Sequence, residues 1–238
     1  MPGWPEALAG DVPDVARTLL GARIVHDSPE GRVAVRLTEV EAYGGVTDGA
    51  SHAWRGPTPR TEVMFGPPGR LYVYFSYGMH WCGNVVTGPD GHASAVLMRA
   101  GRVVEGVDLA RARRGPRVTD RSLARGPACL MQALGLDRGA DGADLLDGGP
   151  VRLEPGEPVD EVAVGPRVGV SREPDRPWRF WLAGDETVST YKRSPRAVPD
   201  STVDDEQHGA VGVPGGRERQ RRHPPPPAAR AASCSSTR

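Results

Sequence analysis

Four of the five tyrosines in this chain fall between Tyr43 and Tyr77, close to Glu41 and His52. Phe, Trp and Tyr make up only 5% of the 238 residues, so this concentration of aromatic side chains is informative. A carboxylate set among planar rings is the local chemistry of a pocket that stacks a flat ring and activates a group beside it. In such a place, an ionised Glu41 makes a good general base for a water molecule.

Arg99 ends a predicted neighbouring strand and is the natural partner for the charge of Glu41. A purely structural buried ion pair explains the same two residues equally well. Tyr43, Tyr74 and His52 could wall a slot for a flat ring, because stacking contributes about 1–3 kcal/mol per base. Taken singly, each tyrosine is more often a core residue whose hydroxyl is hydrogen-bonded. The residues alone therefore indicate a stacking pocket with a buried acid.

Two further candidates stand at a predicted hairpin. Tyr77 precedes Gly78 at the tip, where a large aromatic ring is costly to expose unless it inserts into a partner. Asn84, on the returning strand, either donates to the edge of a bound ring or bonds a turn or strand edge. The six histidines and three cysteines form no HExxH, HxH or CxxC grouping, so we expect no metal, cofactor or disulfide framework.

The alternation of residue types over 32–43 predicts a strand that carries the candidate acid. If this strand is regular, Glu41 and Tyr43 point to the side that buries Val33 and Val35. A carboxylate on such a side needs a partner charge or hydrogen-bond donors.

A long loop over 44–69, rich in Gly, Pro and Thr, carries His52, and loops of this length in compact domains are usually functional. A strand over 70–75 places Tyr72 and Tyr74 on one face. The remaining predicted elements are a short helix capped by Asp11, a returning strand at 81–87, a strand at 93–100, a helix at 127–134 and short strands near 162–170 and 178–182.

Length and composition bound the class of protein. The chain carries 30 Lys and Arg against 30 Asp and Glu, and residues 51–125 are basic within that balance, which suits a polyanionic partner on one face. Composition predicts a folded domain over 1–196 and a disordered Pro, Arg and Ser-rich tail over 197–238. Neither a transmembrane-length apolar run nor a signal-peptide pattern is visible, so we expect a cytoplasmic protein with no membrane contact.

Motifs spread over about residues 5–193 resemble, in order and spacing, the alkyladenine (3-methyladenine) DNA glycosylase family of the mammalian type, which has many bacterial members. The motifs are Glu41-Ala42-Tyr43, Ser51-His52-Ala53, Thr58-Pro59-Arg60, Met64-Phe65, Pro68-Gly69, Tyr72-Val73-Tyr74, Tyr77-Gly78-Met79, Cys82-Gly83-Asn84, Leu97-Met98-Arg99-Ala100, Gly126-Pro127, Gln132-Ala133-Leu134, Arg167-Val168-Gly169-Val170 and Trp178-Arg179-Phe180. The resemblance is highly specific because it does not rest on any single short motif.

The resemblance implies an α+β fold: a single compact domain with a curved antiparallel sheet flanked by helices and a β-hairpin wedge, working as a monomer without metal. It also implies that Glu41 is the general base. The attacking water would be held by Glu41 together with Arg99 and the backbone carbonyl of Val168.

The resemblance further implies a pocket for a base flipped out of the duplex, lined by Tyr43, His52 and Tyr74. Tyr77 would enter the duplex in place of the extruded nucleotide. Asn84 would stand at the pocket rim, where an amino group on guanine is refused. Extruding a base costs a few kcal/mol, least for a damaged or mispaired base.

We therefore expect a DNA glycosylase of base excision repair, associated with the nucleoid, that acts on duplex DNA containing damaged purines. The expected substrates are 3-methyladenine and 7-methylguanine, extending to deaminated or etheno purines. Lys192 is the only lysine, and we expect it at the far end of the domain, away from every pocket motif. Cutting the DNA backbone requires an amine that forms a Schiff base, so we expect a monofunctional enzyme that leaves an abasic site.

Two other functions are consistent with the same residues: a non-enzymatic module that recognises damaged duplex, and a metal-free hydrolase of small nucleosides. If the protein is an enzyme, Glu41→Gln should lose turnover and keep binding, whereas a recognition module would not respond. If it is a nucleoside hydrolase, Tyr77→Ala should leave its activity intact. Two residues depart from the family pattern. Ser76 replaces an apolar residue beside Tyr77, and Cys129 replaces a lysine that would contact phosphate, a role that arginines at 111–125 could take over.

Overall fold

The computed structural model describes residues 3–76, 78–159 and 161–198. Its helices are α1 (Trp4–Leu8), α2 (Val12–Leu19), α3 (Val107–Arg114) and α4 (Pro127–Leu134). Its strands are β1 (Arg23–Ser28), β2 (Gly31–Tyr43), β3 (Leu71–Ser76), β4 (His80–Thr87), β5 (Ser94–Glu105), β6 (Ala124–Arg125), β7 (Val151–Glu154), β8 (Val162–Gly165) and β9 (Arg179–Leu182). Except for its first two residues, the predicted tail at 197–238 lies outside the described residues.

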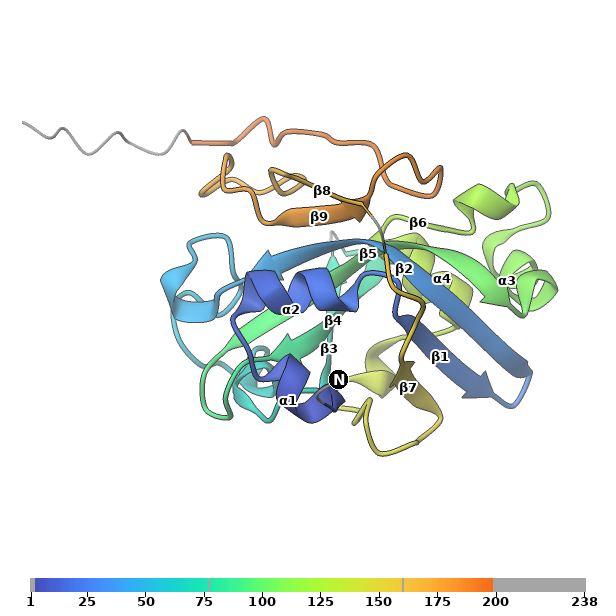
Figure 1. Ribbon diagram of the computed structural model, residues 1–238, viewed down its shortest axis with the longest axis horizontal. Helices are drawn as coiled ribbons and strands as arrows, with labels where there is room; N and C mark the ends of the chain where they lie inside the picture. Colours follow the sequence, from blue (N-terminus) through green and yellow to red (C-terminus); the bar gives the residue numbers. More distant parts are fainter. Residues whose placement is uncertain (1–2, 77, 160, 199–238) are drawn as a thin grey trace, which may run out of the picture. The chain divides into compact units, whose positions relative to one another are not determined.

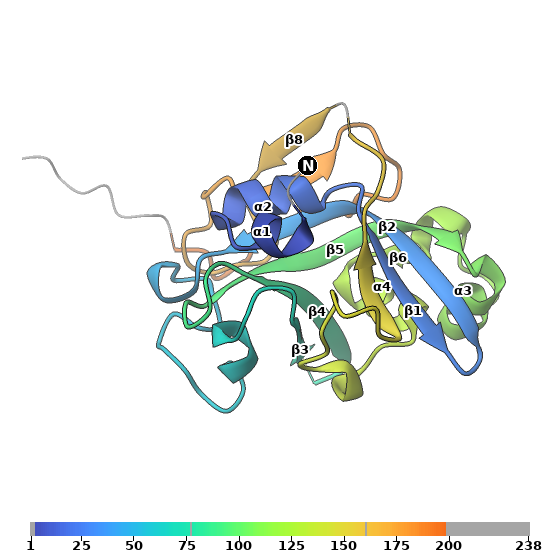
Figure 2. The same cartoon turned by 60° about the horizontal axis from the view of Figure 1, so that its bottom comes forward.

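The strands form one antiparallel sheet in the order β3-β4-β5-β2-β1-β7 (Figure 1). Short strands extend it: β6 pairs with β5, and β9 joins β2 to β8. In both Figure 1 and Figure 2 the loop over 44–69 lies at one end of the sheet, and α3 and α4 lie at the other. The prediction of a single α+β domain built on an antiparallel sheet with flanking helices is confirmed, and the sheet is not closed into a barrel.

Two helices begin and end where the sequence predicts. Asp11 is the N-cap residue of α2 and Pro13 lies in its first turn. The helix α4 runs from Pro127 to Leu134 and ends at Gly135, whose φ of 71° is a left-handed conformation that favours glycine. On α4, Met131 packs close to Gly83, where an added Cβ would lie 2.6 Å from its sulfur.

The expectation that β2 is regular is wrong, and the irregularity positions the candidate acid. The pairing with β5 shifts register between Leu37 and Glu39 and again between Glu39 and Val40, so that Arg99 has no direct partner on β2. The core contains Val33, Val35 and Leu37 before the shift, but Val40 and Ala42 after it. Bulges of this kind redirect side chains near functional sites. Glu39 and Glu41 therefore alternate with core residues and do not face the same core as Val33.

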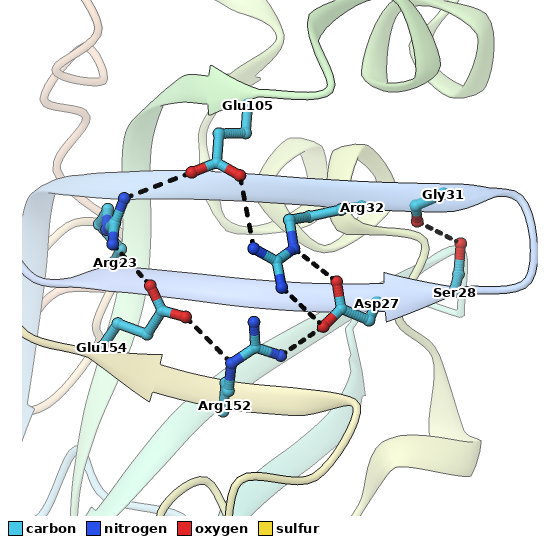
Figure 3. A network of polar contacts seen from close by, with 8 residues as sticks. All are labelled: Arg23, Asp27, Ser28, Gly31, Arg32, Glu105, Arg152 and Glu154. Atoms are coloured by element: carbon cyan, nitrogen blue, oxygen red, sulfur yellow. Dashed lines mark hydrogen bonds and ion pairs between the residues drawn. The ribbon is translucent and has the colours of Figure 1, made fainter.

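A closed ring of six charged side chains joins β1, β2, β5 and β7 (Figure 3). Acidic and basic members alternate around it, at N–O distances of 2.5 to 3.9 Å. Its members are Arg23, Glu105, Arg32, Asp27, Arg152 and Glu154. Hydrogen bonds from Arg32, which has the larger effect, and from Arg152 hold the pKa of Asp27 well below its usual value.

We predict that Asp27→Asn lowers the stability near neutral pH, by an amount that shrinks in acid. A carboxyl whose folded-state pKa is lowered stabilises the fold above its unfolded pKa of about 3.9, and this contribution is lost as pH falls further. Urea unfolding of both proteins at neutral pH and at about pH 2 tests this. A difference between the two proteins that does not shrink in acid, or that survives high salt unchanged, would contradict the electrostatic account.

Candidate active site

Glu41 lies on β2 and is fully buried, and three groups contact its carboxylate. The Tyr43 hydroxyl donates to Oε2 at 2.8 Å, and the backbone N–H of Val168 donates to Oε1 at 2.7 Å. An Arg99 nitrogen lies 3.4 Å from the same Oε1. Burial and the Glu41 charge raise the pKa of Tyr43 well above its usual value, so the hydroxyl stays protonated and donates. The 3.4 Å contact confirms the predicted pairing of Glu41 with Arg99.

A second buried carboxylate, Glu39, holds Arg99 in place. Its Oε1 accepts from Arg99 Nε at 2.9 Å and from Arg179 Nε at 2.7 Å. Both oxygens of Glu39 also accept from Ser189, through its backbone N–H at 2.6 Å and its hydroxyl at 2.9 Å. Burial would lower the pKa of Arg99, but the charges of Glu41 and Glu39 outweigh it and raise that pKa. Arg99 thus bridges two carboxylates two residues apart on β2.

A buried ion pair, Arg167 with Asp48, packs against the ring of Tyr43. Arg167 and Asp48 are fully buried and form a two-pronged ion pair, with nitrogen–oxygen distances of 2.5 and 2.9 Å. The Arg167 guanidinium also donates to the Ala42 carbonyl at 3.0 Å and lies 4.8 Å from the Tyr43 ring centre. Since Arg167 immediately precedes Val168, this pair fixes the segment whose N–H reaches Glu41.

Aromatic rings build a second wall, from β3 and the 44–69 loop. Tyr72 and Tyr74 point to one face of β3 as predicted, with ring centres 5.9 Å apart. The His52 ring meets Tyr74 edge-on at 4.6 Å, and its Nδ1 lies 3.2 Å from the Tyr72 hydroxyl oxygen. Desolvation by the cavity walls and the nearby Arg60 charge lower the pKa of His52 to about 4. This wall therefore presents a neutral imidazole at neutral pH.

We predict that His52 makes the stability pH-dependent in weak acid. The folded protein binds the proton less tightly than the unfolded chain, whose histidine has a pKa of about 6.5. Stability should then fall as pH drops from about 6.5 toward about 4, and His52→Gln should flatten that part of the curve. Urea midpoints across this range test it, with His92→Gln, at an exposed turn, as the matched control. An unchanged curve in His52→Gln would contradict the assignment.

These walls enclose an open cavity of about 1160 Å³. Its lining includes Tyr43, His52, Tyr74, Asn84, Arg99 and Val168, six of the predicted site residues. Asn84 is buried, and its amide nitrogen donates to the Tyr72 carbonyl at 3.1 Å. Ser76 also lines the cavity, so a hydroxyl stands at that edge. Tyr77 lies outside the described residues.

One expectation about location is wrong. Lys192 was expected far from the pocket, but it lines the same cavity. Its backbone carbonyl accepts from the Gly169 N–H at 3.0 Å, which brings the C-terminal segment beside Val168. The side chain is exposed, at the mouth of the cavity, whereas Glu41 is buried. Sequence distance was a poor guide because the chain returns to the sheet after β9.

The basic segment over 111–125 is largely paired within the fold. Arg113 donates to the Ala133 and Leu134 carbonyls at the end of α4. Arg114 binds the Leu123 carbonyl and donates to the Cys129 sulfur at 2.9 Å, so Cys129 is part of this internal network. The suggestion that these arginines replace a phosphate-binding lysine is therefore not supported for Arg113 and Arg114.

Sequence reasoning missed the supporting residues Glu39, Asp48 and Arg167. The signal for Glu39 was present, because a second glutamate two residues before Glu41 shares its face of the strand. The Asp48–Arg167 pair joins residues 119 apart and left no local pattern. Among the described residues, no group of three His, Cys, Asp or Glu side chains gathers as a metal site.

In chemical terms, the arrangement holds one buried carboxylate behind the wall of a cavity that aromatic rings line. Glu41 itself is not among the lining residues; its carboxylate contacts the lining residues Tyr43, Val168 and Arg99. Such a carboxylate is suited to deprotonating water and to stabilising positive charge that develops nearby. The cavity walls can stack a planar ring.

Comparison with known proteins identifies the family to which the chain belongs. A family model described as methylpurine-DNA glycosylase matches residues 6–186. A Nocardia farcinica protein named "Putative 3-methyladenine DNA glycosylase" is 55% identical, covering 83% of this chain and 95% of its own length. Proteins of the same name from Streptomyces avermitilis and Frankia casuarinae are 53% and 54% identical, covering 79% and 74% of this chain and 90% and 86% of their own lengths. The chain belongs to the methylpurine-DNA glycosylase family and is a DNA glycosylase, a hydrolase of N-glycosyl bonds.

Proposed function

We propose that this protein is a monofunctional DNA glycosylase of base excision repair that flips damaged purines into the cavity and hydrolyses their N-glycosidic bond. The proposed substrates are 3-methyladenine and 7-methylguanine in duplex DNA, with deaminated and etheno purines as an extension. The observation that carries the proposal is the buried Glu41, which contacts Tyr43, Val168 and Arg99, three residues that line an aromatic cavity. The relatives that match most of the chain carry the name "Putative 3-methyladenine DNA glycosylase", which supports the same substrate class.

The proposed mechanism uses the carboxylate twice. An alkylated purine carries positive charge and leaves as a neutral base, so the barrier lies in the positive charge that builds at the sugar C1′. Glu41 stabilises that charge and takes a proton from the attacking water, which it positions with Arg99 and the Val168 carbonyl. Tyr43, His52 and Tyr74 stack the base; a neutral His52 adds no positive charge beside a cationic ring.

Two further roles belong to the same proposal. Tyr77 fills the space left in the duplex by the extruded nucleotide, and Asn84 at the cavity wall disfavours undamaged guanine through its amino group; 7-methylguanine is still released because its positive charge makes it a better leaving group. Water rather than an amine is the proposed nucleophile, because the buried Glu41 contacts three residues of the cavity lining and can activate a water there, whereas the Lys192 side chain is exposed. The protein would act as a monomer on DNA of the nucleoid, in the cytoplasm.

No helix in the described part of the chain is long and apolar enough to cross a membrane.

Chromatography of bases released from methylated duplex DNA tests the proposal. We expect free 3-methyladenine and 7-methylguanine, and separate duplexes with hypoxanthine or etheno-adenine set the extent of the range. Strands should break only after alkali, and borohydride should not trap the chain on DNA through Lys192. Breakage without alkali, with a trapped adduct that Lys192→Arg abolishes, would replace the monofunctional assignment by a bifunctional one.

A further inference from the structure

Two arginines lie against one tryptophan at the mouth of the cavity. The guanidinium carbon of Arg172 lies 4.2 Å from the centre of the Trp54 ring, and that of Arg55 lies 4.5 Å from it. All three side chains line the cavity. Stacking on an indole fixes the plane of a guanidinium and leaves its in-plane N–H groups free to donate. The pair of guanidiniums is thus oriented before any ligand arrives.

These two cations differ from most arginines of the fold. In the part of the chain that the structure describes, no carboxylate lies within 4.0 Å of the Arg55 or Arg172 guanidinium nitrogens, whereas Arg99, Arg167 and Arg179 are each paired with a buried acid. Both are exposed. Exposed arginines without an acidic partner, held against the same ring, are each suited to bidentate binding of an external anion.

The backbone beside Arg172 is held in a strained conformation. Glu173 has a φ of 47°, the only positive φ at a residue other than glycine within the described ranges. Its carboxylate accepts from the Gly49 N–H at 2.6 Å and pairs with Arg176. A Cβ on Gly49 would lie 3.3 Å from Cδ of Arg172, so the two loops are closely packed. Strain of this kind persists where surrounding contacts impose it, and it is concentrated at functional sites.

We propose that Arg55, Trp54 and Arg172 form a phosphate clamp for the DNA strand that carries the extruded nucleotide. The inference rests on the proposed function, because a base inside the cavity requires its own sugar–phosphate backbone to pass over the cavity mouth. Each guanidinium binds a phosphate oxygen on that strand, and stacking on Trp54 keeps both guanidiniums oriented for this contact. The clamp contributes affinity that does not depend on sequence.

The salt dependence of binding tests the clamp. Affinity for a duplex with a tetrahydrofuran abasic analogue, which cannot be turned over, is measured between about 50 and 200 mM salt. Each lost phosphate contact lowers the slope of log K against log salt by about 0.9. We therefore expect the magnitude of the slope to decrease by about 1 in Arg55→Gln and in Arg172→Gln, and by about 2 in the double variant. Arg172→Lys keeps the charge and should have the wild-type slope.

Arg17→Gln is the matched control. Arg17 also stacks on an aromatic ring, 4.7 Å from the centre of Phe180, but it does not line the cavity. Its slope should equal that of the wild type. Wild-type slopes in Arg55→Gln and Arg172→Gln, or an equal decrease in Arg17→Gln, would overturn the clamp.

The outcome is separable from that of the proposed function. Because the abasic analogue reports binding alone, smaller slopes support a phosphate clamp even in a protein that releases no base. Base release by the wild type together with unchanged slopes would overturn the clamp and leave the glycosylase intact.

Discussion

Replacement of Glu41 by glutamine is expected to reduce base excision by about 10³-fold or more, with little loss of binding to damaged duplex. Removing a general base alone typically costs 10²- to 10⁴-fold, and the same substitution removes the negative charge that faces the developing positive charge at C1′. Glutamine keeps the size of the side chain, and Arg99 keeps its contact with Glu39. The fold should therefore survive, and the loss should appear in the single-turnover rate at saturating enzyme.

The matched control for this substitution is Glu161→Gln, at an exposed position before β8. It should excise and bind as the wild type does. If Glu41→Gln lost binding and turnover in parallel, the pair of Glu41 and Arg99 would be a purely structural buried ion pair. If it kept wild-type turnover, another group would have to activate the water.

Replacement of Asp48 by asparagine is expected to lower the free energy of unfolding by about 3–5 kcal/mol, because it leaves a buried guanidinium without its partner charge. Arg167 is fully buried, and its Nε has no hydrogen-bond partner among the residues that the structure describes. Excision should fall as well, since Arg167 contacts the Tyr43 ring and precedes Val168. Urea unfolding measured beside single-turnover kinetics gives both effects.

The double variant Asp48→Asn with Arg167→Met separates a charge effect from a packing effect. Replacing both members of a buried pair by groups of similar size is often close to neutral, so stability should recover by several kcal/mol. A loss below about 1 kcal/mol in Asp48→Asn, or no recovery in the double variant, would show that the pair does not stabilise the fold in this way.

Local patterns in the sequence predicted the elements that are governed by local rules. The alternation around Tyr72 and Tyr74 predicted β3 and the face that its tyrosines share, and a proline start and a glycine stop predicted α4. The bulges on β2 and β5 were not predictable, because register depends on how two distant strands pair. After the shift, even-numbered residues of β2 face the core in place of odd-numbered ones, so Glu39 and Glu41 lie together on the side away from that core.

The site residues that lie in family motifs could be predicted from the sequence, but the residues that hold them in place could not. Glu41, Tyr43 and Arg99 were predicted together, and the structure brings them into contact. Nothing local in the sequence indicated that Ser189 would reach Glu39, 150 residues away. The same return of the chain brings Lys192 to the cavity, against the expectation from sequence distance.

The activity that we propose for this cavity is hydrolysis of the bond between a damaged purine and its sugar. The most direct test is single-turnover reaction of the wild-type chain with a duplex containing one 3-methyladenine, following free base and strand integrity together. We expect release of 3-methyladenine at a rate independent of enzyme concentration at saturation, with a strand that stays intact until alkali is added. Tight binding of that duplex with no released base would contradict this proposal, and would favour a module that recognises damage without repairing it.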